Sequence, residues 1–369
     1  MDVKKILIVI YQNKLGGAEK QAILYANAIN QIPGYAAEII FCLEEVDEVF
    51  RQYCADMQVK CTYIPLFNIG ARNFLPKLYY ILKLRLLKPF GLIAFTTMPN
   101  LFTGLIWKYT GAKFFLWNQL DVLELPSYID RSYFHKAYGN ATGAIVNAKH
   151  SVQFLEKTFP VVKPSYFIGN AIDIETGRIS EKSLNEVYGI EEGSMIVTMV
   201  ANLQVNKDHL TVLKALLQIP ERYKVHVLFV GYLGANTEGV INFVNQNRLR
   251  DKVTLCGQVE NVSSVLQHTH LLIHSSKSEG MSVAVLEAVL SDIPVVATRI
   301  PGNIEVMGEQ YKYYFEVADE TSLANAIIAA LDNYSELKQY AYDLHKELAP
   351  LYSREHMKET LAGILHKIA

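Results

Sequence analysis

Short apolar runs alternate with helix-length segments along almost the whole chain of 369 residues. Such runs are typical of buried strands, and the segments between them are long enough for crossover helices. The alternation therefore predicts an α/β architecture with mostly parallel sheets. In the first half the runs are residues 6–11, 38–43, 61–64, 92–97, 114–117 and 144–147. In the second half they are residues 196–201, 225–230, 253–256, 271–274 and 295–297.

The two sets of runs predict two Rossmann-like domains, because the chain is long enough for two domains of ordinary size. Between residues 173 and 194, glycines, serines and charged residues interrupt the pattern. We therefore predict an N-terminal domain at residues 1–173 and a C-terminal domain at residues 174–351. The last segment, residues 352–369, is amphipathic and predicts a final helix.

The charge balance and the cysteines exclude several classes of protein. Lys and Arg number 35 against 37 Asp and Glu, so the chain lacks the basic footprint of a nucleic-acid-binding protein. Cys42, Cys54, Cys61 and Cys256 show neither a CxxC pair nor zinc-ligand spacing, which indicates reduced thiols in a cytoplasmic protein. The apolar run at residues 6–11 is too short for a signal peptide, and no stretch reaches the roughly 18 apolar residues of a membrane span.

Residues 275–298 place two carboxylates in a predicted strand–turn–helix–strand segment. Glu279 lies on the turn, where Gly280 keeps the backbone open and Ser282 is a favourable N-cap. Glu287 lies within the helix, which is otherwise apolar and is therefore expected to be buried. The free N–H groups of the helix start, together with the helix dipole, attract anions.

This combination suits a sugar nucleotide, because its hydroxyls need carboxylate acceptors and its diphosphate needs N–H donors. On local chemistry alone, a second interpretation carries equal weight. In that interpretation Glu287 is buried and paired with a structural Lys or Arg, and Glu279 is solvated.

From Glu279 to Glu287, and on through the predicted strand at residues 294–297, the segment resembles the E-x7-E signature of the retaining nucleotide-sugar glycosyltransferases with the GT-B fold, glycosyltransferase family 4. The resemblance implies two facing Rossmann-like domains with a donor cleft between them, and a final helix that packs back on the first domain. It implies retaining transfer of a hexose-type sugar from a nucleotide-diphospho sugar, with UDP as the expected nucleotide, to a glycan or a lipid-linked acceptor. The process it suggests is synthesis of a cell-surface polysaccharide or glycolipid.

The resemblance assigns a role to each charged group. Glu279 is expected to hold sugar hydroxyls and to stabilise the positive charge that develops on the sugar, and Glu287 is expected to hold the ribose hydroxyls. Lys207, which follows a predicted strand, is expected to stabilise the leaving diphosphate as a point charge. The alternative for Lys207 is an ordinary surface lysine at a helix start. Further donor contacts are expected at Gly280, Met281, Ser282 and Val283.

Further donor contacts are implied at the ends of other predicted strands. Gly16 and Gly17 resemble the first loop of the family, where paired glycines let the backbone approach the donor, although glycines also shape ordinary strand-to-helix turns. Asn202 stands where many relatives carry arginine, so one cation is missing there. The backbone of Gly257 and Val259 is expected to pair with the nucleotide base.

Asn118, Gln119 and Asp121 follow a predicted strand and are expected to contact the sugar or the acceptor, with a structural turn as the alternative for Asp121. Many relatives carry a histidine near this point. The resemblance places Asn118 at that position in this chain, and this departure counts against a histidine-assisted step.

The sequence also predicts transfer without a metal or a cofactor. His268, His270 and His274 are divided between the two faces of a predicted strand, so satisfied or surface roles are expected for them. The Asp-x-Asp motif, by which the other large glycosyltransferase fold holds a metal diphosphate, does not occur in the chain.

Residues 76–88 form a basic amphipathic segment that is rich in leucine and tyrosine. One interpretation is a peripheral contact with the inner face of the membrane, which would bring the protein to a lipid-linked acceptor. The alternative is a crossover helix whose leucines pack on the sheet while its cations are solvated. Two rival functions also stay open for the chain: a sugar-nucleotide hydrolase or epimerase on the same fold, and a non-catalytic GT-B partner protein.

Overall fold

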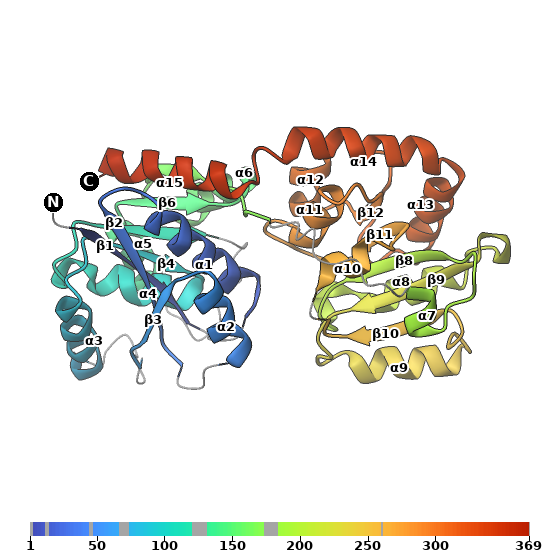
Figure 1. The fold of residues 1–369 in the computed structure, drawn as a ribbon, viewed down its shortest axis with the longest axis horizontal. Coiled ribbons are helices and arrows are strands. Elements are labelled where there is room, and N and C mark those ends of the chain that lie inside the picture. Colours follow the sequence, from blue (N-terminus) through green and yellow to red (C-terminus); the bar gives the residue numbers. More distant parts are fainter. Residues whose placement is uncertain are drawn as a thin grey trace. The chain divides into compact units, whose positions relative to one another are not determined.

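The computed structural model describes residues 3–11, 15–43, 47–65, 74–119, 131–172, 184–259 and 261–368. The chain divides into two compact units (Figure 1). Unit 1 comprises Met1–Ala171 together with Leu351–Ala369, and unit 2 comprises Ile172–Pro350. Each unit is built on one parallel sheet with helices packed on it, so the predicted α/β class is confirmed.

The described residues of unit 1 form a seven-stranded sheet with the strand order β3-β2-β1-β4-β5-β6-β7, and each neighbouring pair is parallel. The strands are β1 (Lys4–Ile10), β2 (Tyr35–Phe41), β3 (Lys60–Tyr63), β4 (Gly91–Phe95), β5 (Phe114–Gln119), β6 (Gly143–Val146) and β7 (Ser165–Phe167). The helices are α1 (Gly17–Asn30), α2 (Glu48–Asp56), α3 (Phe74–Leu86), α4 (Thr97–Ile106), η1 (Trp107–Tyr109), α5 (Arg131–Asn140), α6 (Lys149–Thr158) and α15 (Arg354–Ile368).

Both faces of the first sheet are covered, which explains why its strands are continuous apolar runs. Successive side chains of β1 point to opposite faces. Ile6 and Ile8 join the apolar cluster formed with α1 and α15. Leu7 and Val9 join a second cluster, which contains buried residues of α3 and α5.

The last helix, α15, belongs to unit 1 although it follows unit 2 in the sequence. Met357, Leu361, Ile364 and Leu365 recur at helical spacing and are buried in the same cluster as α1. This apolar face docks the end of the chain on the first sheet.

The described residues of unit 2 form a six-stranded parallel sheet with the strand order β10-β9-β8-β11-β12-β13. The strands are β8 (Met195–Val200), β9 (Val225–Val230), β10 (Val253–Gly257), β11 (Leu271–His274), β12 (Val295–Thr298) and β13 (Tyr314–Phe315). The helical elements are α7 (Leu184–Tyr188), η2 (Val205–Lys207), α8 (His209–Leu216), η3 (Glu221–Tyr223), α9 (Thr237–Gln246), α10 (Val262–Leu266), α11 (Val283–Val289), α12 (Pro301–Met307), α13 (Glu320–Asp332) and α14 (Tyr334–Leu348).

The strand order of unit 2 reverses between β8 and β11. From β8 the chain continues to β9 on one side, whereas β11 and β12 lie on the other side. In open α/β sheets, ligands bind beyond the carboxyl ends of the strands at such a reversal. The loops that leave β8 and β11 are therefore the place where unit 2 is expected to hold a ligand.

Each of the eleven predicted apolar runs overlaps a strand. Sequence reasoning missed β7 and β13, which have three and two residues. Such short strands carry too few side chains to show a periodic pattern. Among the described residues, none of the helices has the length and apolar character needed to cross a bilayer.

Candidate functional site

Two loops of unit 2 are tied together at the reversal of the strand order. The first follows β8 and the second follows β11, and the two strands are parallel neighbours. Ser275 Oγ donates a hydrogen bond of 2.8 Å to the carbonyl oxygen of Lys207. The backbone N–H of Lys277 donates to the carbonyl oxygen of Asn206, also at 2.8 Å. These bonds fix the backbone from which the charged side chains extend.

Lys207 and Glu279 form an ion pair across these two loops. Lys207 ends the short 3-10 helix η2, and Asp208 then adopts a left-handed backbone with φ of 57° before α8 begins. Nζ of Lys207 contacts Oε1 of Glu279, and the side chains are 22% and 16% exposed. The pair is therefore largely shielded from water, where a charge–charge contact is stronger than at the surface.

His274, the last residue of β11, is the second side chain that reaches Glu279. Its Nε2 atom lies 3.6 Å from Oε1 of Glu279, and its side chain is 5% exposed. Burial raises the pKa of Glu279, but the contact with His274 and the charge of Lys207 outweigh burial and lower the pKa to about 2. Glu279 is consequently an anion at neutral pH.

Residues of β12 and α12 hold the loop that carries Glu279 in place. Thr298 Oγ1 donates to the carbonyl oxygen of Ser276 at 2.8 Å, and Asn303 Nδ2 donates to the carbonyl oxygen of Thr298 at 2.8 Å. Gly302 packs directly under the loop: a Cβ atom there would lie 2.8 Å from the carbonyl oxygen of Gly280 and 2.9 Å from that of Glu279. Only glycine fits this position without displacing the loop.

The helix after the loop differs from the prediction. Four residues of α11 are buried, but Val283, Ala284 and Glu287 are only partly buried and lie along one side of the helix. Glu287 is thus not the fully buried carboxylate that the apolar sequence predicted. The prediction was wrong because Val283 and Ala284 are apolar whether or not anything covers them.

The prediction for Ser282 was right about its position and wrong about its hydrogen bond. Ser282 occupies the N-cap position of α11, but its side chain makes no capping hydrogen bond. Among the described residues, its buried Oγ atom has no hydrogen-bond partner. Met281 beside it is buried as well. The backbone at Ser282 and Val283, which the sequence analysis assigned to the donor, is the start of the seven-residue helix α11.

The other donor-binding candidates of unit 2 lie at the ends of β8, β9 and β10. Asn202 Oδ1 accepts a 2.9 Å hydrogen bond from the backbone of Tyr232, so its amide links two strand ends. The carbonyl oxygen of Gly257 accepts from the N–H of Gly231 at 2.9 Å, and Gly257 has φ of +67°. The half-buried Val259 packs on an apolar cluster that includes Ile196 and Val265.

The remaining candidates lie in unit 1. Gly16 and Gly17 form the start of α1, and a Cβ atom on Gly16 would lie 2.7 Å from Oε2 of Glu19. Asn118 and Gln119 end β5 and are buried. The candidate Asp121 lies outside the described residues.

Gln119 is held by a structural bond. Its Oε1 atom accepts a 2.9 Å hydrogen bond from Nε1 of Trp117, which is itself fully buried. The carbonyl oxygen of Asn118 accepts a 2.7 Å hydrogen bond from Nδ2 of Asn100. Both residues therefore fasten the end of β5 to its neighbours.

His274 is the site residue that the sequence analysis missed. The prediction of a satisfied role suits His270, whose Nδ1 accepts a 3.0 Å hydrogen bond from the backbone of Ile196. His274 instead faces Glu279. Its position as the last residue of a predicted strand, at the carboxyl end of a parallel sheet, is the signal that could have singled it out.

In the comparison with known protein families, the match lies in the second half of the chain. Residues 180–345 match the family described as Glycosyl transferases group 1. N-acetyl-alpha-D-glucosaminyl L-malate synthase of Bacillus anthracis is 27% identical over 200 residues, which are 53% of this chain and 52% of that protein. UDP-Gal:alpha-D-GlcNAc-diphosphoundecaprenol alpha-1,3-galactosyltransferase of Escherichia coli is 25% identical over 173 residues, 45% of either chain. The matched segment thus spans about half the length of these curated relatives.

Solved structures resemble the chain over nearly its full length. The crystal structure of HepE from Anabaena, in complex with UDP and glucose, has a TM-score of 0.84 at 18% identity and covers 99% of this chain and 100% of that one. A glycosyltransferase from Rickettsia africae has a TM-score of 0.84 at 17% identity and covers 100% and 99%.

The two parallel sheets and the full-length structural likeness thus define the class of fold, which is the α/β fold of GT-B type. Lys207, His274, Glu279 and Glu287 all lie within residues 180–345, the segment that matches the glycosyl transferases group 1 family.

Proposed function

We propose that this protein is a retaining glycosyltransferase that moves a hexose-type sugar from a nucleotide-diphospho sugar, with UDP as the nucleotide, to a glycan or lipid-linked acceptor. The observation that carries the proposal is the largely buried Glu279, held as an anion by Lys207 and His274 where the strand order of unit 2 reverses. Sugar–nucleotide transfer requires both signs of charge at one place, because the sugar becomes positive while the diphosphate becomes negative.

The roles of the charged groups follow from this geometry. When the bond between the sugar C1 atom and the diphosphate oxygen breaks, the anionic Glu279 stabilises the positive sugar. Lys207 exchanges part of its contact with Glu279 for the more highly charged diphosphate. The acceptor oxygen then bonds to C1, and its proton leaves to the departing phosphate. Lys207 and backbone N–H groups supply the positive charge, so we propose that transfer needs no metal and no cofactor.

The nucleotide and the biological process are proposed from the relatives. HepE was solved with UDP and glucose, and the E. coli relative is named for a UDP-galactose donor and an undecaprenol-linked acceptor. We extend this chemistry to the present chain as a UDP-sugar donor and a role in the synthesis of cell-surface polysaccharide or glycolipid. Glu287 lies on the partly exposed side of α11, and we propose that it holds the ribose hydroxyls.

The test is calorimetric titration of the full chain with UDP, GDP, ADP and CMP and with their common sugar derivatives. We expect UDP and one UDP-sugar to bind, and Glu287→Ala to weaken both. Binding with release of free sugar in the absence of any acceptor would indicate a hydrolase instead. A folded sample that binds none of these compounds would favour the non-catalytic partner protein and overturn the proposal.

A further inference from the structure

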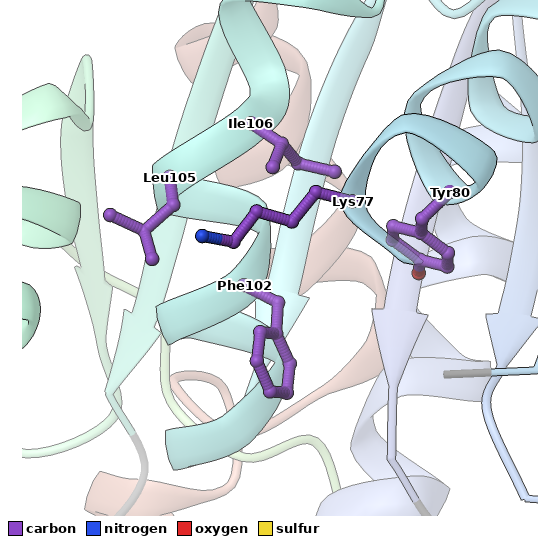
Figure 2. A pocket seen from close by; sticks show the side chains of 5 residues that line it. All are labelled: Lys77, Tyr80, Phe102, Leu105 and Ile106. Carbon is purple, nitrogen blue, oxygen red and sulfur yellow. The ribbon is translucent and has the colours of Figure 1, made fainter. Parts of the chain in front are cut away.

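Helix α3 of unit 1 is held to the unit by one of its two apolar sides. Tyr80 and Leu84 are its buried residues. Figure 2 shows Lys77 and Tyr80 of α3 beside Phe102, Leu105 and Ile106 of α4, with the aliphatic chain of Lys77 extending toward α4. Anchoring on this side leaves the opposite side of α3 free of the core.

The opposite side of α3 is apolar as well, and it is exposed. Six large apolar side chains share it, and the most exposed are Leu75 and Leu86, at 75% and 76%. At about 100° per residue they fall on one face of the helix, away from Tyr80 and Leu84. The exposed side chains are Phe74, Leu75, Leu78, Tyr79, Leu82 and Leu86. The interpretation of residues 76–88 as an ordinary crossover helix with packed leucines is thus wrong for most of these leucines.

The charges around this face have one sign. Residues 74–90 contain four cations and no Asp or Glu. Lys83 and Arg85 are exposed and lie near the two edges of the apolar face, and Lys83 Nζ is 5.5 Å from the ring centroid of Tyr79. Next to α3, the short helix η1 adds Lys108 and the exposed Tyr109. An apolar face bordered by cations and aromatic rings is complementary to an anionic lipid surface.

We propose that α3 lies on a bilayer that contains anionic lipid, with the face from Phe74 to Leu86 inserted among the acyl chains and with Lys83, Arg85 and Lys88 at the headgroups. This contact does not depend on the proposed transferase activity. Its value for an acceptor that is lipid-linked, by contrast, rests on the proposed function. Docked in this way, unit 1 would meet such an acceptor on a surface and not from dilute solution.

The experiment measures binding of the full chain to sedimented vesicles, without any sugar nucleotide. We expect binding to vesicles of phosphatidylcholine and phosphatidylglycerol, weaker binding at high salt, and little binding to phosphatidylcholine alone. Replacing three exposed leucines, in Leu75→Ser/Leu82→Ser/Leu86→Ser, is expected to weaken binding at least tenfold. Neutralising three cations, in Lys83→Gln/Arg85→Gln/Lys88→Gln, is expected to weaken it about a hundredfold.

A matched control replaces three exposed leucines elsewhere, in Leu217→Ser/Leu233→Ser/Leu351→Ser, and is expected to bind like the unaltered chain. UDP titration of every variant separates the two proposals, because vesicle binding can be lost while nucleotide binding persists. Failure of the unaltered chain to bind anionic vesicles overturns the proposal. A concentration-dependent dimer that the α3 leucine variant abolishes would also overturn it, since a second copy of the chain would then cover the face.

Discussion

Nζ of Lys207 is paired with Oε1 of Glu279 although 72 residues separate them in the sequence. The pair joins the loops after β8 and β11, so two residues predicted to act on opposite ends of a sugar–phosphate bond are brought together by the parallel neighbours of one sheet. The contact also gives Lys207 a specific partner, which the alternative interpretation as an ordinary surface lysine did not predict. Its consequences can be tested in several ways.

Lys207→Ala is expected to reduce the rate of transfer about a hundredfold or more, because a single donor to a developing negative charge contributes about 3 kcal/mol. The measurement is kcat with a saturating UDP-sugar. Lys277→Ala is the matched control. Lys277 lies on the same loop as Glu279, but its Nζ atom is 3.9 Å from Oδ2 of Asp208, so its ion-pair partner is Asp208 and not Glu279. The assignment of Lys207 fails if its substitution costs less than about threefold.

Ionisation of Glu279 is expected to make the free energy of unfolding decrease as the pH falls into the acidic range. Its pKa is lowered from 4.5 to about 2, so its ionised form stabilises the fold fully above about pH 4.5, and that stabilisation is lost as the pH falls toward 2. The shift corresponds to about 3 kcal/mol at neutral pH. We expect the difference in free energy of unfolding between the unaltered chain and Glu279→Gln to fall by about half at about pH 3.

Urea unfolding at the two pH values measures this difference. Glu191→Gln is the control, because Glu191 is 75% exposed and pairs with the exposed Lys224. Surface pairs of that kind contribute little to stability. A difference for Glu279→Gln that stays constant between neutral and acidic pH would contradict the ion pair.

Gly302→Ala is expected to destabilise the protein by about 1–3 kcal/mol, because the new Cβ atom would overlap the backbone of the Glu279 loop. The same overlap should lower kcat by moving Glu279. Thermal unfolding and steady-state kinetics measure the two effects. Gly363→Ala on α15 meets nothing within 4 Å and should instead stabilise by about 0.5–1 kcal/mol. Equal effects of both substitutions would show that close packing at Gly302 is unimportant.

The side chain of Gln21 holds the backbone of Ala171, the residue at which the first segment of unit 1 ends. Its buried amide donates to the carbonyl oxygen of Ala171 at 2.9 Å and accepts from the N–H of Ala171 at 3.1 Å. Gln21→Ala should cost about 2 kcal/mol or more, since both backbone groups would lose their partner inside the protein. Gln31→Ala, which removes an exposed hydrogen bond to Asn27, should change the unfolding midpoint much less.

Much of the fold could be predicted from local patterns. Strands such as β9 and β11 are short apolar runs whose bounds agree with the prediction, because both faces of a parallel sheet are covered. The spacing of Glu279 and Glu287 likewise pointed to the segment that carries the candidate site. The burial of Glu287 was mispredicted, since the composition of α11 does not say which of its sides the sheet covers.

The sequence by itself determined the alternation of strands and helices and the identity of the charged groups at the strand ends, because these depend on residues close together in the chain. Only the tertiary structure decided that His274 and Lys207 both meet Glu279, since that contact depends on which strands are neighbours. Only the tertiary structure showed that the leucines of α3 stay exposed. A helix with two apolar sides has the same sequence whichever side the protein covers, and long-range packing makes that choice.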